Sequence, residues 1–207
     1  MTAARCGPRD RPASTGGSAT ALLLVDYINP LDFDHGEALR PAAEKAAART
    51  AELKRKLKAK SIPTIYANDN FGRWRSEFSE LVAACAEPDS RGHKLAQALK
   101  PDPDDLSVLK PRHSAFYGSP LEFLLAELEV RRLVIAGLVT EMCVLFTAHD
   151  AYVRKFELWV PEDCVASVAG EDHARTISHL RDVLGADTRA SDAVTLEEAL
   201  ELRAPKE

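Results

Sequence analysis

Paired cysteines are missing from this sequence of 207 residues. Its four cysteines, Cys6, Cys85, Cys143 and Cys164, are far apart and form no CxxC pair. Cysteine-based metal sites need closely spaced thiols, and small disulfide-bonded folds need more of them. The sequence therefore gives no support for a zinc-type site or a disulfide scaffold, and it predicts free thiols.

A surplus of positive charge and a long apolar stretch are missing as well. The formal net charge is −5 at pH 7, whereas proteins that bind nucleic acid or anionic membranes generally present a basic surface. No apolar run approaches the length of a membrane span, and the N-terminus lacks the apolar core of a signal peptide. We therefore expect a cytoplasmic protein that has neither nucleic acid nor a membrane as its partner.

What the sequence does contain is a regular alternation of short apolar runs and helical patterns. Residues 1–18 are rich in Gly, Pro, Ser and Arg, which predicts a disordered tail and places a single domain at residues 19–207. The apolar runs predict strands at residues 19–25, 62–67, 106–109, 132–136, 157–160 and 187–190. Helices are predicted at about residues 37–60, 76–86, 92–99, 119–129, 141–152, 171–184 and 196–202.

This order of elements predicts the fold class. Strands that alternate with helices are typical of βαβ units, so we expect an α/β, three-layer doubly wound fold with a six-stranded, mainly parallel sheet and helices on both faces. The uninterrupted apolar run at residues 19–25 suits a central strand that is buried on both faces. Gly137 is expected to end the strand at residues 132–136. No GxGxxG motif follows the first strand, which argues against dinucleotide binding.

Three reactive side chains follow predicted strands directly: Asp26, Lys110 and Cys143. In a parallel sheet the carboxyl ends of the strands lie at one edge, where ligands bind. Taken singly, each residue is better explained by an ordinary role, with Asp26 as a loop cap, Lys110 as a solvated charge and Cys143 as part of the core. Taken together, they predict one reactive site at this edge.

Cys143 is expected to lie in the first turn of a helix. Free backbone N–H groups and the positive end of the helix dipole are found there, and both favour thiolate over thiol. The sulfur is thus a candidate nucleophile. Cys85 and Cys164 are expected to be packed in the core.

Three segments resemble the isochorismatase-like cysteine hydrolases, a family that includes nicotinamidases, N-carbamoylsarcosine amidohydrolases and ureidoacrylate amidases. The segments are LLLVDYINPL, LWVPEDCVAS and the long stretch that runs from VLKPRHSAFYG to GLVTEMCVLFTAHDAY. The resemblance implies the fold of this family and places Asp26, Lys110 and Cys143 at its Asp-Lys-Cys catalytic triad. It also implies a cis peptide bond between Leu138 and Val139, and an oxyanion hole formed by the backbone N–H groups of Val139 and Cys143.

The sequence departs from the metal-binding nicotinamidases of this family. Those relatives carry an Asp-x-His signature after the second strand, whereas this chain reads NDNFGRW at residues 68–74. Asp69 alone does not supply the several ligands that a divalent ion needs, and His93 is expected on a helix surface. We therefore expect no metal and no cofactor.

Residues that contact a substrate are harder to identify. Four aromatic residues lie in loops that follow the first three predicted strands, and their rings are expected either to line the binding crevice or to pack within the loops: Phe33, Phe71, Trp74 and Tyr117. Arg73 and Arg112 are candidates for binding a substrate carboxylate. His113 and His149 are weaker candidates for substrate contacts.

The sequence thus predicts a cysteine hydrolase that cleaves a C–N bond of a small amide, carbamoyl or ureido compound through a covalent thioester. The alternatives are an isochorismatase-type hydrolase of a non-amide bond, a nicotinamidase, and a binding protein without activity, since a fold alone never proves function. The resemblance also implies a homo-oligomer, either a dimer or a tetramer.

Overall fold

The structure is a computed structural model, and it describes residues 19–72, 74–75 and 77–201. Several sequence predictions fall outside these residues. They concern the tail at residues 1–18 with Cys6, the role of Arg73, the first residue of the helix predicted at 76–86, and the end of the helix predicted at 196–202.

The described residues form alternating strands and helices. The strands are β1 (Thr20–Val25), β2 (Thr64–Asp69), β3 (Leu106–Lys110), β4 (Arg132–Leu138), β5 (Glu157–Trp159) and β6 (Val165–Ala166). The α-helices are α1 (Gly36–Lys58), α2 (Phe78–Ala86), α3 (His93–Ala98), α4 (Leu121–Glu127), α5 (Leu145–Val153), α6 (Gly170–Asp182) and α7 (Leu196–Leu200). A π-helical turn, η1 (Thr140–Val144), precedes α5, and a 3-10 turn, η2 (Glu162–Cys164), precedes β6.

The sheet confirms the predicted fold class. Its strands follow the order β3-β2-β1-β4-β5, with β6 also paired to β4, and every pairing is parallel. The central strand β1 aligns Leu22 with Thr64 of β2 and with Val134 of β4. Because the chain moves outward from β1 first on one side and then on the other, the strand order reverses beside β1. Ligands of such sheets bind at this reversal.

The sixth strand is not the one that the sequence predicted. The strand expected at residues 187–190 is reduced to a single bridge between Asp187 and Trp159, whereas β6 lies in a segment for which the sequence predicted neither a strand nor a helix. At two residues, β6 is too short to give a recognisable pattern. It pairs with Gly137 and Leu138 of β4, beyond the three residues of β4 that pair with β5.

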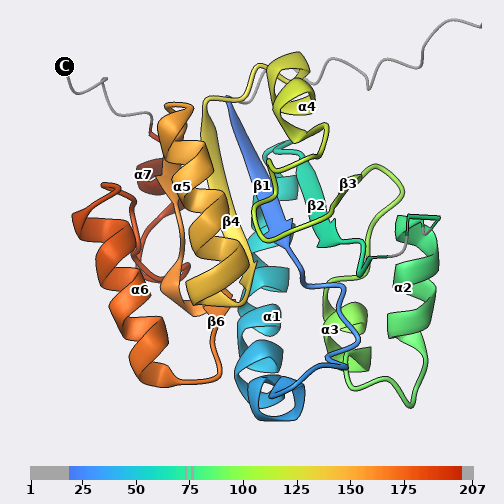
Figure 1. The fold of residues 1–207 in the computed structure, drawn as a ribbon. Coiled ribbons are helices and arrows are strands. Elements are labelled where there is room, and N and C mark those ends of the chain that lie inside the picture. The colour runs from blue at the N-terminus through green and yellow to red at the C-terminus, as the bar shows by residue number, and fades with distance from the viewer. Residues whose placement is uncertain (1–18, 73, 76, 202–207) are drawn as a thin grey trace, which may run out of the picture.

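The residues of β1 alternate between two hydrophobic layers, one on each face of the sheet. Leu22 and Leu24 pack with residues of α1, α2, α3 and α7. Ala21, Leu23 and Val25 pack with residues of α4, α5 and α6. Both faces of the strand are therefore dry, which is why its sequence is uninterruptedly apolar. Figure 1 shows the sheet between these helices.

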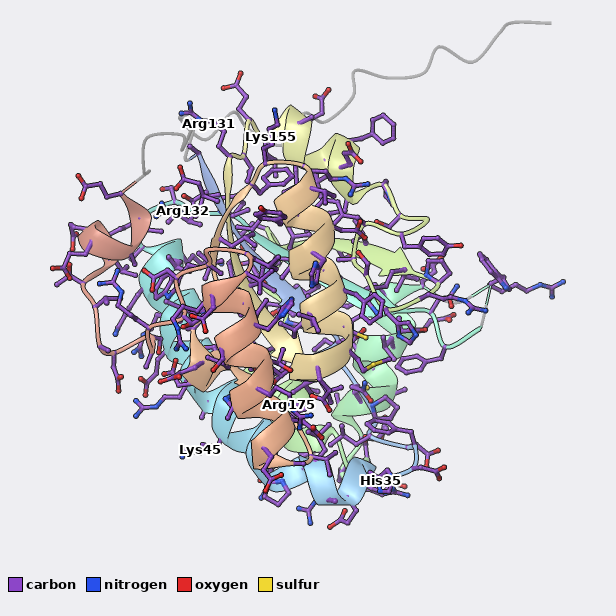
Figure 2. All side chains as sticks on the ribbon, turned by 60° about the vertical axis from the view of Figure 1, so that its left-hand side comes forward. His35, Lys45, Arg131, Arg132, Lys155 and Arg175 are labelled. Carbon is purple, nitrogen blue, oxygen red and sulfur yellow. The ribbon has the colours of Figure 1, made fainter. Side chains whose placement is uncertain are left out.

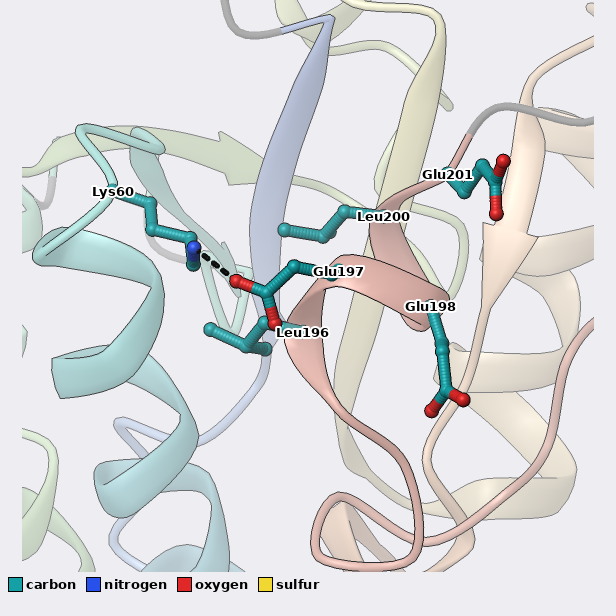
Figure 3. Close-up of a pocket in the computed structure, with 6 residues that line it drawn as sticks. All are labelled: Lys60, Leu196, Glu197, Glu198, Leu200 and Glu201. Carbon is teal, nitrogen blue, oxygen red and sulfur yellow. Dashed lines mark hydrogen bonds and ion pairs between the residues drawn. The ribbon is translucent and has the colours of Figure 1, made fainter.

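Different residues lie at the amino ends of the strands and at the opposite end of the molecule. Arg131, Arg132 and Lys155 lie near the amino ends of β4 and β5, and His35 lies at the opposite end of the molecule (Figure 2). Figure 3 shows a hollow lined by Lys60 and residues of α7. It is also near the amino ends, since the guanidinium of Arg132, the first residue of β4, donates to the Ala199 carbonyl of α7. Among the described residues, no helix is long and apolar enough to cross a membrane.

Candidate active site

Asp26 follows the last residue of β1 at the carboxyl edge of the sheet. Its N–H donates to the Ala67 carbonyl at 3.0 Å, and its side chain is almost fully buried, with 4% of the residue exposed. The backbone is left-handed, with φ 53°, a conformation that Asp adopts more readily than most residues but still at some energetic cost. A buried carboxylate in a strained turn is a common feature of functional sites.

Lys110 ends β3, two strands away from Asp26, and its side chain crosses β2 to reach the carboxylate. The residue has no exposed surface. Its Nζ lies 2.8 Å from Asp26 Oδ2 and donates to Cys143 Sγ at 3.6 Å. Lys110 is therefore not the solvated charge of the ordinary interpretation, because burying an ammonium is tolerable only when it is paired.

Cys143 lies in η1, directly after β4, and its thiol hydrogen-bonds to Asp26. The residue is partly exposed, whereas Cys85 and Cys164 are fully buried. The structure thus brings the three predicted side chains together at one edge of the sheet, although they are up to 117 positions apart in the sequence. Parallel pairing of β1, β2, β3 and β4 is what makes them converge.

The turn that carries Cys143 is not the first turn of an α-helix. It is π-helical, and the Val139 carbonyl accepts from the N–H groups of Met142 at 3.1 Å and Val144 at 3.3 Å. The N–H of Cys143 lies between these two donors in the sequence. Among the described residues, it does not donate to this carbonyl. π-helical turns of this kind are frequent at functional sites.

The expectation that the helix terminus favours a thiolate is wrong for the resting site. Burial raises the pKa of the Cys143 thiol, and the negative charge of Asp26 raises it further, while Lys110 acts in the opposite direction. Desolvation and the adjacent carboxylate outweigh the ammonium. Cys143 is therefore a thiol at neutral pH, and it is hydrogen-bonded to a base, Asp26.

Asp26 and Lys110 form a coupled buried pair. Burial raises the pKa of Asp26 and is only partly offset by Lys110 and by hydrogen bonds from Cys143 and the Asp69 backbone. Burial alone lowers the pKa of Lys110, but Asp26, Cys143 and Asp69 outweigh it, so the net pKa of Lys110 is raised. The lysine remains an ammonium, and the carboxylate is a stronger base than an exposed Asp.

Asp69 is a part of the site whose position sequence reasoning missed. Its N–H donates to Asp26 Oδ1 at 2.7 Å, and its Oδ2 lies 3.8 Å from Lys110 Nζ. The sequence analysis weighed Asp69 only as a metal ligand. The rule that led to Asp26 and Lys110 applies to it equally, because Asp69 is the last residue of β2.

The residues around Asp69 do not fit a divalent metal ion. Its Oδ1 accepts the N–H of Phe71 at 2.7 Å, and the Lys110 ammonium faces its other oxygen. Phe71, not a histidine, lies two positions after Asp69. One carboxylate beside a fixed positive charge is a poor cation ligand. The one converging group of His, Cys, Asp or Glu side chains in the described ranges, Asp102, Asp104 and Asp105, is paired with Lys54 and Lys58.

The segment before Cys143 approaches β1 very closely. The peptide bond between Leu138 and Val139 is cis. Gly137 does not end β4, as predicted, but continues it to Leu138 with φ 154°. A Cβ atom on Gly137 would lie 2.2 Å from the Val25 carbonyl oxygen. The glycine therefore allows close contact between two strands, and the chain turns only after Leu138.

The four aromatic residues follow the expected strands, but they are exposed. Phe33 and Phe71 are each 43% exposed, Tyr117 is 61% exposed and Trp74 is 81% exposed. Packing within the loops does not account for this much exposed ring surface at Trp74 and Tyr117. Whether these rings contact a substrate stays a prediction.

The other candidates for substrate contacts have protein partners or lie on the surface. The His113 ring packs against Phe146 with centroids 5.5 Å apart, and His149 Nε2 is 3.0 Å from His179 Nε2. Arg112 is exposed. None of these contacts involves Asp26, Lys110 or Cys143.

Comparisons with known proteins identify the family of this chain. The isochorismatase domain family matches residues 20–192. The uncharacterized isochorismatase family protein YaaI of Bacillus subtilis is 36% identical over 174 residues, which are 84% of this chain and 95% of that protein.

Two solved structures show the same fold. The N-carbamoylsarcosine amidase of Thermoplasma acidophilum is 25% identical, with a TM-score of 0.65 over 84% of this chain and 98% of that one. The nicotinamidase PncA of Bacillus subtilis is 26% identical, with a TM-score of 0.64 over 83% and 99%. From the matched domain, the relative and the shared fold, we conclude that this chain belongs to the isochorismatase family of hydrolases.

Proposed function

We propose that this protein hydrolyses a C–N bond of a small amide, carbamoyl or ureido compound through a thioester on Cys143. The observation that carries the proposal is the contact of three groups, because Lys110 Nζ touches both Asp26 Oδ2 and Cys143 Sγ while the thiol hydrogen-bonds to Asp26. A nucleophile, its base and a fixed positive charge are the parts that covalent acyl transfer requires. Asp26, Lys110 and Cys143 are the proposed catalytic residues.

The first step forms the bond between sulfur and carbon. Asp26 takes the proton of the Cys143 thiol, the sulfur attacks the carbonyl carbon, and the π electrons of the carbonyl move to its oxygen. Lys110 stays an ammonium and balances the charge that leaves Asp26 for the sulfur. The backbone N–H groups of Val139 and Cys143 hold the oxyanion, and one such donor contributes about 3 kcal/mol in comparable sites.

The second step releases the amine, and the third restores the thiol. Protonated Asp26 gives its proton to the leaving nitrogen as the C–N bond breaks, which leaves a thioester. Asp26 then takes a proton from water, whose oxygen attacks the thioester carbonyl. The C–S bond breaks, the acid is released, and the proton returns to the sulfur. Asp26 thus acts as a base and then as an acid twice in one cycle.

The relatives support cleavage of a C–N bond. The names of the two solved structures describe an amidase and a nicotinamidase, and the site described above supplies the groups for such a reaction without a bound metal. Phe71 and Tyr117 are proposed to line the approach of the substrate, together with Phe33 and Trp74, because all four lie in loops at the edge that carries Cys143.

A screen of small amides, carbamoyl and ureido compounds tests the function. We expect at least one compound to release ammonia or an amine, and we expect rapid acid quenching to trap an acyl group on the peptide that contains Cys143. Mass spectrometry identifies the modified cysteine. Cleavage of vinyl ethers such as isochorismate, with no amine released from any compound, would instead support the non-amide alternative.

The activity is expected to fall on the acidic side as Asp26 becomes protonated. The net pKa of Asp26 is raised above 3.8. The carboxylate is therefore protonated, and lost as a base, at a higher pH than the carboxylate of an ordinary aspartate. A profile of kcat/KM against pH measures this midpoint. A rate that stays constant down to pH 4 would contradict Asp26 as the base.

A further inference from the structure

The turn that carries Cys143 has a side-chain partner from a distant part of the chain. Thr140, the first residue of η1, has no exposed surface. Its Oγ1 lies 3.1 Å from Nδ1 of His173, which is 33 positions later in the sequence. His173 belongs to α6, and this end of α6 lies on the same side of the molecule as His35, as the label on Arg175 shows in Figure 2.

Thr140 occupies a position that matters for the proposed oxyanion hole. It lies directly after Val139 and three residues before Cys143, the two residues whose N–H groups are proposed to hold the oxyanion. Because Thr140 begins the turn that joins these two residues, a change in its orientation shifts this turn and with it the two N–H groups. Small errors in such an arrangement reduce the rate strongly, because the donors must point at the place where charge develops.

The surroundings of His173 keep its ring neutral near pH 7. Burial lowers the pKa of His173, and the carboxylates of Glu162 in η2 and Glu141 in η1 only partly oppose this. Asp172 on its own helix is paired with Arg175. A neutral imidazole has one donor and one acceptor nitrogen, so it is able to bond to a hydroxyl in either direction.

We propose that His173 is a positioning residue for the reaction, which acts by fixing Thr140 and through it the backbone N–H groups of Val139 and Cys143. This inference rests on the proposed function, but it assigns a role to a residue that the sequence analysis did not single out. Helix α6 thereby takes part in holding the oxyanion, although its histidine does not touch the thiol.

The experiment uses a small aldehyde, which probes the oxyanion hole without a known substrate. The Cys143 thiol adds reversibly to the aldehyde carbon, so that an S–C bond forms, the C=O π bond breaks and the oxygen takes the place of the oxyanion or its protonated form. Propionaldehyde is the probe, and its affinity is measured by how well it protects Cys143 from alkylation by iodoacetamide. The variants are His173→Ala, His173→Asn and His179→Ala.

Each variant has a different expected result. In His173→Ala we expect the aldehyde to bind about 10-fold more weakly, in line with a misaligned donor, while alkylation without aldehyde stays within twofold of the wild type because Asp26 and Lys110 are intact. Asn places a polar atom near the position of Nδ1, so His173→Asn should restore most of the affinity. His179→Ala removes a comparable contact from the same helix, the one to His149 on α5, and should leave aldehyde binding unchanged.

The outcomes separate this inference from the proposed function. Aldehyde binding within twofold of the wild type in His173→Ala, or an equal loss in His179→Ala, would overturn the role of His173 while leaving the function of Cys143 intact. A wild-type protein whose Cys143 is alkylated at the same rate with and without aldehyde would contradict the proposed oxyanion hole, and the role of His173 with it.

Discussion

Replacing Cys143 by alanine is expected to lower kcat for the hydrolysed amide by about 10,000-fold or more. In enzymes that use a covalent nucleophile, kcat falls by a factor of this order when the nucleophile is removed. The binding site and the oxyanion hole then provide only the residual catalysis. In this protein the loss should be large because Asp26 and Lys110 both contact the sulfur and act on it in the proposed reaction. The turnover rate and the trapped acyl group are measured in parallel, and both should disappear.

The fold should survive this substitution. Cys143 is partly exposed and lies in a turn rather than in the centre of either hydrophobic layer, so the free energy of unfolding should fall by no more than about 1 kcal/mol. Cys85→Ala is the matched control, because Cys85 is fully buried in α2. We expect this control to lose about 1 kcal/mol or more of stability and to keep the wild-type rate. Turnover by Cys143→Ala within tenfold of the wild type would contradict the thioester mechanism.

The sequence contained enough information to predict which side chains converge at the carboxyl edge of the sheet. Asp26 and Lys110 each end an apolar run, and parallel strands bring such positions to one edge. The apolar runs are easy to recognise because β1 and β4 are buried on both faces of the sheet. Burial on both faces favours apolar residues at every position. The long helix α1 was equally clear, because its buried positions recur at helical spacing over 23 residues.

The features that were missed depend on contacts between distant segments. The hydrogen bond between His173 and Thr140 follows from packing, which no local pattern reports. Asp69 ends β2 as Lys110 ends β3, but its contacts with Asp26 and Lys110 depend on the pairing of these strands. The two residues of β6 form a strand only because β4 continues past Gly137. The expected thiolate at Cys143 was wrong for the same reason, since the preference at a helix terminus is outweighed by burial and by a carboxylate from another strand.

Replacing Lys110 by methionine is expected to affect both activity and stability. Methionine keeps most of the volume of the side chain but leaves Asp26 buried without the ammonium that lies 2.8 Å away in the wild type. Breaking a buried pair by removing one partner costs about 3 to 5 kcal/mol, which corresponds to a fall in the unfolding temperature of roughly 10 °C for a chain of this size. Activity should fall by about 1,000-fold, since the charge that accompanies thiol deprotonation loses its counter-ion.

The pH dependence of this destabilisation identifies its cause. Without Lys110, the main influence that lowers the pKa of Asp26 is gone, so the folded-state pKa rises further above its value in the unfolded chain. The folded variant then holds a proton that the unfolded chain releases, and the variant loses stability relative to the wild type as the pH rises from about 4. We therefore expect the free energy of unfolding, measured with denaturant, to differ little between variant and wild type at pH 4.5. At pH 8 the difference should be large.

A double variant supplies the control for this last prediction. Asp26→Asn combined with Lys110→Met removes both charges, and a neutral pair of similar volume is often as stable as the buried ion pair it replaces. We expect the double variant to regain most of the stability that Lys110→Met loses at pH 8, with no pH dependence from this position and no recovery of activity. If the double variant were as unstable as the single one, the cause would be lost packing rather than an unpaired carboxylate. The ion pair with Lys110 would then not be the reason that the Asp26 carboxylate can be buried beside the thiol.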